Sequence, residues 1–92
     1  MRESKIEAYF CTAIEARGGV CWKWTSPGMR GVPDRIAVLP GNRIFFVELK
    51  APGEVPEPHQ ARVHKVLRKL GAVVYDVDSV EAVDALMRNL TP

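Results

Sequence analysis

Two strand-like runs joined by a short reversal constrain the fold of this 92-residue chain more than any other feature. One run extends from Asp34 to Leu39 and the other from Arg43 to Lys50, and both have the apolar composition of strands. Pro40-Gly41-Asn42 lies between them and has the composition of a tight turn. The pattern therefore predicts a β-hairpin whose outer ends lie side by side.

A helix and a short strand are predicted before the hairpin. The helix should end at Gly18-Gly19, and Ser4 and Glu7 at its start have the spacing of a capping box. Val20 to Trp24 is β-branched and aromatic enough to form a strand, which we expect at the edge of the sheet. The apolar residues that recur at helical spacing are Ile6, Phe10, Ala13 and Ile14.

Two helices and one strand are predicted after the hairpin. Pro58 suits the first turn of a helix that ends at Gly71, and Ala72 to Val77 is apolar enough for a strand. Asp78 and Glu81 have capping-box spacing at the start of a closing helix. The expected order is α-β-β-β-α-β-α, a single α/β domain over residues 1–92 in which helices flank a mixed sheet. The last strand should pair parallel to its neighbour because a helix precedes it.

The composition is that of an ordinary globular protein. Hydrophobic residues make up 47% and charged residues 26%, and no apolar run approaches the length of a membrane span. The N-terminus mixes both signs of charge and lacks the apolar stretch of an export signal, so we expect a cytoplasmic location. The net charge of +2 permits a polyanionic partner without requiring one.

Cysteine and histidine offer little for a metal site. Cys11 and Cys21 fall in a predicted helix and a predicted strand, where small buried thiols are expected. They form no CxxC pair, and the two histidines add too few ligands to predict a zinc site. His59 and His64 should lie on different faces of the second helix, so we expect both at the surface.

Two carboxylates and a lysine converge at the open end of the predicted hairpin. Counting outward from the turn places Asp34 beside Glu48 and Leu49, and strand alternation projects Glu48 and Lys50 to one face. Magnesium prefers hard oxygen ligands, usually one or two carboxylates with water and phosphate. The pattern predicts a Mg²⁺ or Mn²⁺ site at Asp34 and Glu48. Lys50 would orient or deprotonate the attacking water, or stabilise the transition state.

Two short segments carry a resemblance to a known family. Gly31-Val32-Pro33-Asp34-Arg35, followed by Phe46-Val47-Glu48-Leu49-Lys50, resembles the signature of the PD-(D/E)xK nucleases and, more narrowly, of their VRR-NUC branch. Members of that branch also have an early helical Glu and a Gln at the start of the helix after the hairpin, and Glu7 and Gln60 occupy those places here. The resemblance covers almost the whole chain and implies a restriction-endonuclease-like fold.

The resemblance implies five catalytic residues, which are Lys50, Glu48, Asp34, Glu7 and Gln60. The metal ligands would be the two hairpin carboxylates with the Leu49 backbone carbonyl, and Lys50 would be the catalytic lysine. Glu7 would act through a metal-bound water or on a second metal, although a helical Glu of this kind is as often a solvated or capping residue. Gln60 would support the site or contact the substrate.

Basic residues near the predicted site are candidates for DNA contacts, although each could equally belong to a solvated surface. They are Lys23, Arg30, Arg35, His59, Arg62 and Lys65. The loop from Thr25 to Gly31 is expected to clamp the substrate, because its glycines allow close approach and Arg30 offers a bidentate phosphate contact. For Trp22 and Trp24, packing in the core or in a dimer is favoured over stacking on a base.

Together these patterns predict a metal-dependent endonuclease that hydrolyses DNA phosphodiester bonds. A chain of this length has little surface with which to grip a duplex, so we expect a homodimer that prefers branched or four-way-junction DNA, as the resemblance also implies. The alternatives are a non-catalytic nucleic-acid-binding or assembly module that retains the nuclease fold, and a purely structural module. A complete set of metal ligands with Lys50 argues against both.

Overall fold

The computed structural model describes residues 1–90 and has the predicted order of elements. The elements are α1 (Glu3–Ala16), β1 (Val20–Lys23), β2 (Arg35–Leu39), β3 (Arg43–Leu49), α2 (Pro58–Lys69), β4 (Val74–Val77) and α3 (Val80–Leu90). The strands form one sheet in the order β1-β2-β3-β4, antiparallel except for the parallel β3–β4 pair. The predicted mixed α/β fold is therefore confirmed, with β1 at an edge.

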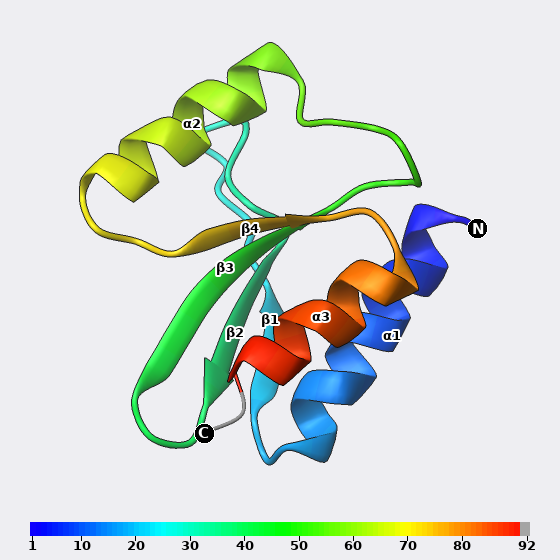
Figure 1. Cartoon of the computed structure of the whole chain (residues 1–92). Helices are drawn as coiled ribbons and strands as arrows, with labels where there is room; N and C mark the ends of the chain where they lie inside the picture. Colours follow the sequence, from blue (N-terminus) through cyan, green and yellow to red (C-terminus); the bar gives the residue numbers. More distant parts are fainter. Residues whose placement is uncertain (91–92) are drawn as a thin grey trace.

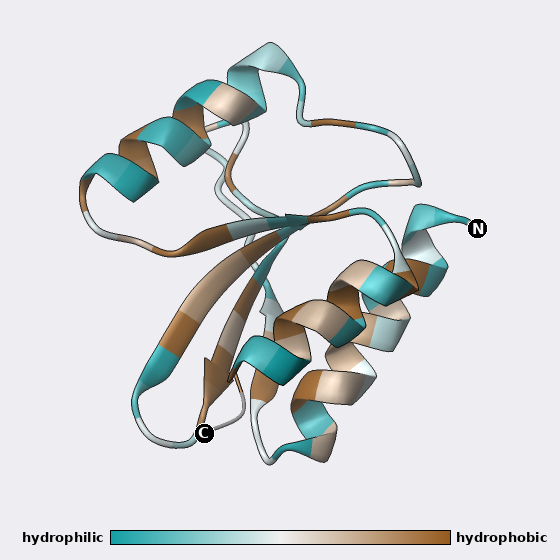
Figure 2. Ribbon diagram, viewed as in Figure 1, coloured by the Kyte–Doolittle hydropathy of each residue, from teal (hydrophilic) through white to brown (hydrophobic). Residues whose placement is uncertain are grey.

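Helices cover the two faces of the sheet unequally (Figure 1). Helices α1 and α3 pack side by side over one face, whereas α2 lies over β4 on the other face. The apolar colouring of the strands in Figure 2 runs between these two layers. No helix among residues 1–90 has the length and apolar character required to cross a bilayer.

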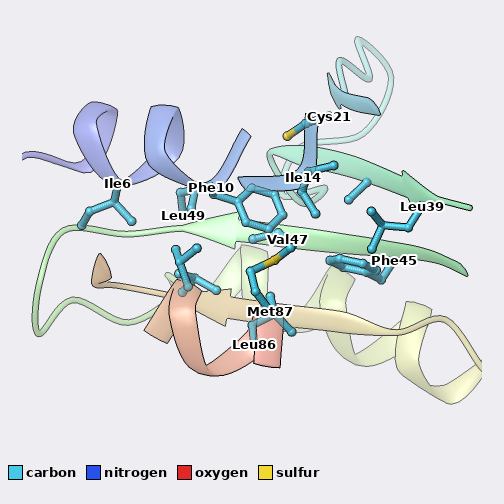
Figure 3. Packing of buried hydrophobic residues seen from close by; sticks show 13 residues of the cluster. Ile6, Phe10, Ile14, Cys21, Leu39, Phe45, Val47, Leu49, Leu86 and Met87 are labelled. Atoms are coloured by element: carbon cyan, nitrogen blue, oxygen red, sulfur yellow. The ribbon is translucent and has the colours of Figure 1, made fainter. Parts of the chain in front are cut away.

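The main hydrophobic core lies between the sheet and the α1–α3 layer. Figure 3 shows side chains from α1, the hairpin and α3 pointing toward one another. Fully or almost fully buried members include Ile6, Phe10, Ile14, Phe45, Val47, Leu49, Val83 and Met87. Burying a side chain of this size contributes about 1.5–3 kcal/mol. Because alternate residues of a strand face opposite ways, burial of Val47 and Leu49 in this core directs Glu48 to the α2 side.

The β2–β3 turn sets the register on which the site depends. Leu39 pairs with Arg43 across the turn, and Gly41 and Asn42 have φ values of 87° and 62°. Glycine and asparagine are the residues that adopt this left-handed conformation most readily. The turn thus aligns the two strands without strain, and their outer ends meet as predicted.

Two predicted helix starts are wrong. Helix α1 begins at Glu3 without a side-chain cap, so the capping box of Ser4 and Glu7 does not form. At α3 the cap is Ser79 rather than Asp78, because Ser79 Oγ accepts a 3.0 Å hydrogen bond from the backbone N–H of residue 82. Both differences are shifts of one or two residues, the scale on which local capping signals compete with tertiary contacts.

The two cysteines are free thiols that contact each other between α1 and β1. Cys21 is buried and Cys11 half-buried, and their Sγ atoms are 2.6 Å apart. Burial, together with the hydrogen bond to Cys11, raises the pKa of the Cys21 thiol. This agrees with the prediction of small thiols in the core.

The substitution Gly19→Ala tests the close approach of the α1–β1 connection to β2. A Cβ atom at residue 19 would lie 2.5 Å from the Val38 carbonyl oxygen and 2.8 Å from Leu39 Cδ2, so the backbone must shift. We expect the free energy of unfolding to fall by about 1–3 kcal/mol, as in other overpacked sites. Gly28→Ala is the matched control because a Cβ atom there meets nothing within 4 Å. The measurement is the midpoint of urea unfolding, and equal midpoints for the two variants would contradict this packing.

Candidate active site

The outer end of the hairpin brings the two predicted carboxylates together. Arg35 pairs with Val47, so the next step of the ladder places Asp34 opposite Glu48. Asp34 Oδ2 accepts a 2.9 Å hydrogen bond from the backbone N–H of Leu49. This bond fixes the Asp34 carboxylate across the two strands and leaves Oδ1 available for another ligand.

Glu48 is a buried carboxylate with two differently used oxygens. Its side chain is 1% exposed. Oε2 accepts a 3.1 Å hydrogen bond from Gln60 Nε2 and lies 3.3 Å from Lys50 Nζ, whereas Oε1 has no hydrogen-bond partner. An unpartnered buried carboxylate oxygen is costly in a core, so the position favours a cationic ligand.

The electrostatics at Glu48 have the form expected of a functional site. Burial and the nearby Asp34 carboxylate raise the pKa of Glu48 from 4.5 to about 7, and Lys50 opposes part of this rise. Two neighbouring carboxyl groups with little access to solvent raise each other's pKa, because their negative charges repel. Strongly perturbed carboxyl groups of this kind cluster at catalytic and metal sites.

Gln60 connects the lysine to the buried carboxylate. Its Oε1 accepts hydrogen bonds from Lys50 Nζ at 2.8 Å and from the backbone N–H of Glu57 at 2.9 Å, while Nε2 donates to Glu48. Glu57 and Gln60 also form a capping box at the start of α2, which the sequence analysis missed. The start of the helix therefore holds the Gln60 amide in place beside Lys50.

The available oxygen atoms suit a hard cation whose remaining ligands are water or phosphate. In the described part of the chain, no three His, Cys, Asp or Glu side chains gather closely enough to hold a metal alone. Asp34 Oδ1 and Glu48 Oε1 are the available carboxylate oxygens, and the Leu49 carbonyl follows Glu48 on β3. One or two carboxylates completed by water and phosphate is the usual coordination of Mg²⁺. A closed zinc site, which needs four protein ligands, does not fit.

Glu7 lies against Arg35 of β2. Its Oε2 forms a 2.7 Å ion pair with Arg35 Nε, so the carboxylate is occupied by a partner on β2. Glu3, one helical turn earlier, was not predicted as a site residue, yet burial and the Asp34 carboxylate raise its pKa. The spacing of Glu3 and Glu7 places both on one face of α1 and was the signal that could have identified Glu3.

The prediction that His64 lies at the surface is wrong. Its side chain is fully buried, with Nε2 3.6 Å from Glu48 Oε1 and Nδ1 3.5 Å from Asp76 Oδ1. Gln60 and His64 are four residues apart and so share one face of α2, which turns toward β3 and β4. His59 keeps 30% of its side chain exposed, closer to the prediction.

The candidate DNA-contacting side chains divide into two groups. Arg35 is occupied within the fold, because Nε binds Glu7 and Nη1 donates a 3.1 Å hydrogen bond to the Cys21 carbonyl oxygen. The exposed members are Lys23, Arg30, Arg62 and Lys65. The loop that precedes Asp34 packs on α2, since a Cβ atom at Gly31 would lie 3.2 Å from Gln60 Cα. The predicted clamp loop is therefore close to the site.

Apolar side chains gather on the face of the sheet opposite α1. Trp24 packs against Phe46 with ring centroids 5.1 Å apart, whereas Trp22 and Ile44 are 65% and 58% exposed. Trp22, Ile36 and Phe46 form one row across three strands on this face. We call the surface formed by Trp22, Ile36, Ile44 and Phe46 the open sheet face.

Comparisons with known proteins agree with this site. No protein-family model matches the chain. A protein of Acyrthosiphon pisum secondary endosymbiont phage 1 named "Putative nuclease p44" is 48% identical over 79 residues, which cover 86% of this chain and 85% of that protein. A solved structure described as a VRR_NUC domain superposes with a TM-score of 0.91 at 38% identity and covers 97% of both chains. With its hairpin signature, fold and phage relative in agreement, the chain belongs to the VRR-NUC family of nucleases.

Proposed function

We propose that this nuclease is an endonuclease that hydrolyses DNA phosphodiester bonds with a divalent cation held at Asp34 and Glu48. The observation that carries the proposal is the buried Glu48 carboxylate, whose Oε1 lacks a partner and whose pKa is about 7. This arrangement is unfavourable without a cation and suited to binding one. The phage relative named as a nuclease supports the class of reaction.

The chain's own residues would divide the work as follows. Asp34 Oδ1, Glu48 Oε1 and the Leu49 carbonyl would hold Mg²⁺ or Mn²⁺, which supplies polarisation of the phosphate and activation of a water. Lys50 Nζ, 2.8 Å from Gln60 Oε1, sets a positive charge beside the carboxylates, where it would stabilise charge developing on the phosphate or orient the attacking water. Gln60 would keep that ammonium in place.

We propose that DNA approaches across the start of α2 and the loop of residues 25–31. Phosphate contacts would come from the exposed basic residues Arg30, Arg62 and Lys65. Lys23 is a weaker candidate, because it pairs with Arg35 in the sheet and so projects to the α1 side. Arg35 is better assigned to holding α1 against the sheet, because Glu7 and Cys21 already occupy its guanidinium. The place of action would be the cytoplasm of a bacterial or phage-infected cell, in keeping with the phage source of the relative.

The open sheet face supports a homodimer that acts on branched or four-way-junction DNA. Trp22 and Ile44 are large apolar side chains that remain 65% and 58% exposed, and clustered exposure of this kind is typical of interfaces. A second copy related by a two-fold axis would cover this face on both chains. The assembly would present two cutting sites to a substrate with two strands to cleave.

Lys50→Ala should lower the rate of DNA cleavage by roughly 10²–10³-fold, the loss typical of removing one group that stabilises transition-state charge. The assay uses labelled single-stranded, duplex, flap and four-way-junction DNA with Mg²⁺, Mn²⁺ or chelator. Arg88→Ala, which removes an exposed charge from α3, is the control and should cut normally. DNA that binds but is never cut with any metal would favour the non-catalytic module instead.

Binding of Mn²⁺ should weaken as the pH falls through the pKa of Glu48, because the cation needs the ionised carboxylate. With that pKa raised to about 7, Glu48 is ionised at pH 8 and mostly protonated at pH 6. We expect affinity about tenfold higher at pH 8 than at pH 6, measured by calorimetry without DNA. Asp34→Ala should bind no Mn²⁺ at either pH. Equal affinity at both pH values would argue against Glu48 as a ligand.

Ile44→Asp should convert the dimer to a monomer by placing a charge on the open sheet face. Light scattering at micromolar concentration should give twice the mass of one chain for the unmodified protein and the mass of one chain for the variant. Val55→Asp is the control, since Val55 is 75% exposed and lies outside this face. A monomeric unmodified protein would remove the basis for the dimer.

A further inference from the structure

A second set of side chains reaches Glu48 at Oε1, the oxygen that is not paired with Lys50. His64 Nε2 lies 3.6 Å from Glu48 Oε1, and His64 Nδ1 lies 3.5 Å from Asp76 Oδ1. Asp76 Oδ2 in turn accepts a 3.2 Å hydrogen bond from Arg68 Nη2. Glu48, His64, Asp76 and Arg68 therefore form a continuous series from the buried site to the surface, which we call the His64 series.

The unpartnered polar atoms of the buried side chains coincide with this series. Among the described residues, the buried side-chain atoms without a hydrogen-bond partner are Glu48 Oε1, His64 Nδ1 and His64 Nε2. Buried polar groups normally have partners, and an apolar side chain at residue 64 would serve packing alone at lower cost. The position of the imidazole is therefore better explained by the carboxylates it faces than by the stability of the core.

The elements that carry the series also fix its geometry. Glu48 is directly paired with Asp76 in the parallel β3–β4 register, so both carboxylates project to the α2 side. Helix α2 places Gln60 on Oε2 of Glu48 and His64 on Oε1. Arg68, one turn further, holds Asp76 and also donates to the Val74 carbonyl oxygen at 2.7 Å. Residues on one face of α2 thus contact both carboxylate oxygens of Glu48.

We propose that His64 is a positioning residue that holds the Glu48 carboxylate in its metal-binding orientation, with Asp76 and Arg68 holding the imidazole. The inference rests on the proposed metal site. Among the described residues, no three His, Cys, Asp or Glu side chains are arranged to hold a metal ion, so we assign His64 a role that acts through Glu48 rather than as a ligand. Groups that orient metal ligands typically change metal affinity or activity by 10–100-fold.

Three substitutions separate this role from packing. His64→Gln keeps an amide nitrogen near the place of Nε2 and should retain most of the Mn²⁺ affinity. His64→Asn reaches only the place of Nδ1, and His64→Leu keeps volume without polarity, so both should weaken Mn²⁺ binding by roughly 10–100-fold. The cleavage rate constant should fall with them, whereas KM for DNA should not change because the exposed basic residues are untouched. Thermal unfolding with chelator checks that each variant is folded.

The outcomes distinguish this inference from the proposed function. If the unmodified protein binds Mn²⁺ and His64→Leu binds it equally well, the positioning role is overturned and the metal site stands. If the unmodified protein ignores Mn²⁺, the proposed function fails and the positioning role fails with it. Should His64→Leu not fold, Asp76→Asn asks the same question at a side chain that is 36% exposed. Its Mn²⁺ affinity should fall several-fold, and unchanged affinity would overturn the proposal.

Discussion

The buried carboxylate of Glu48 is the constraint around which the rest of this structure is arranged. Its pKa of about 7 lies well above the ordinary value of 4.5, and each unit of such a shift corresponds to about 1.4 kcal/mol. Because the folded state holds the Glu48 proton more tightly than the unfolded state does, the metal-free protein becomes less stable as the pH rises from about 4.5 through 7. The loss in the free energy of unfolding is roughly 3 kcal/mol at most. The core between the sheet and α1–α3 must offset that cost, and a bound cation would remove it.

Helix α2 joins folding to the site through single residues with two roles. Gln60 completes the capping box that starts the helix and also binds both Lys50 and Glu48. His64 fills the interior beneath the same helix while it faces two carboxylates. Polar groups that are poorly satisfied in a folded protein concentrate at functional sites, where the strain serves the chemistry. Changes that destabilise α2 should therefore also disturb the arrangement of Glu48 and Lys50.

The parts of the site that local rules determine could be predicted from the sequence. A turn with residues suited to positive φ sets the hairpin register, and strand alternation then brings Asp34, Glu48 and Lys50 to one end and one face. The α1 stripe of Ile6, Phe10 and Ile14 follows from helical periodicity and is buried as expected. Short-range geometry was sufficient in each case.

The missed features depend on how elements meet in space. Glu7 and its partner Arg35 are 28 residues apart, and neither the catalytic role nor the capping role predicted for this acid included their ion pair. His64 looked like a surface residue because the packing of α2 on the sheet is not encoded in the helix itself. Gln60 could have corrected this, since a residue needed at the site implies that its neighbour four positions on faces inward too.

The same alternation relates the metal site to the proposed dimer. Ile44, Phe46 and Glu48 project to one face of β3, while Phe45, Val47 and Leu49 project to the core. At about 3.3 Å per residue, Ile44 and Glu48 are roughly 13 Å apart along the strand. In the proposed dimer, a second copy that covered Ile44 would therefore lie close to the active site.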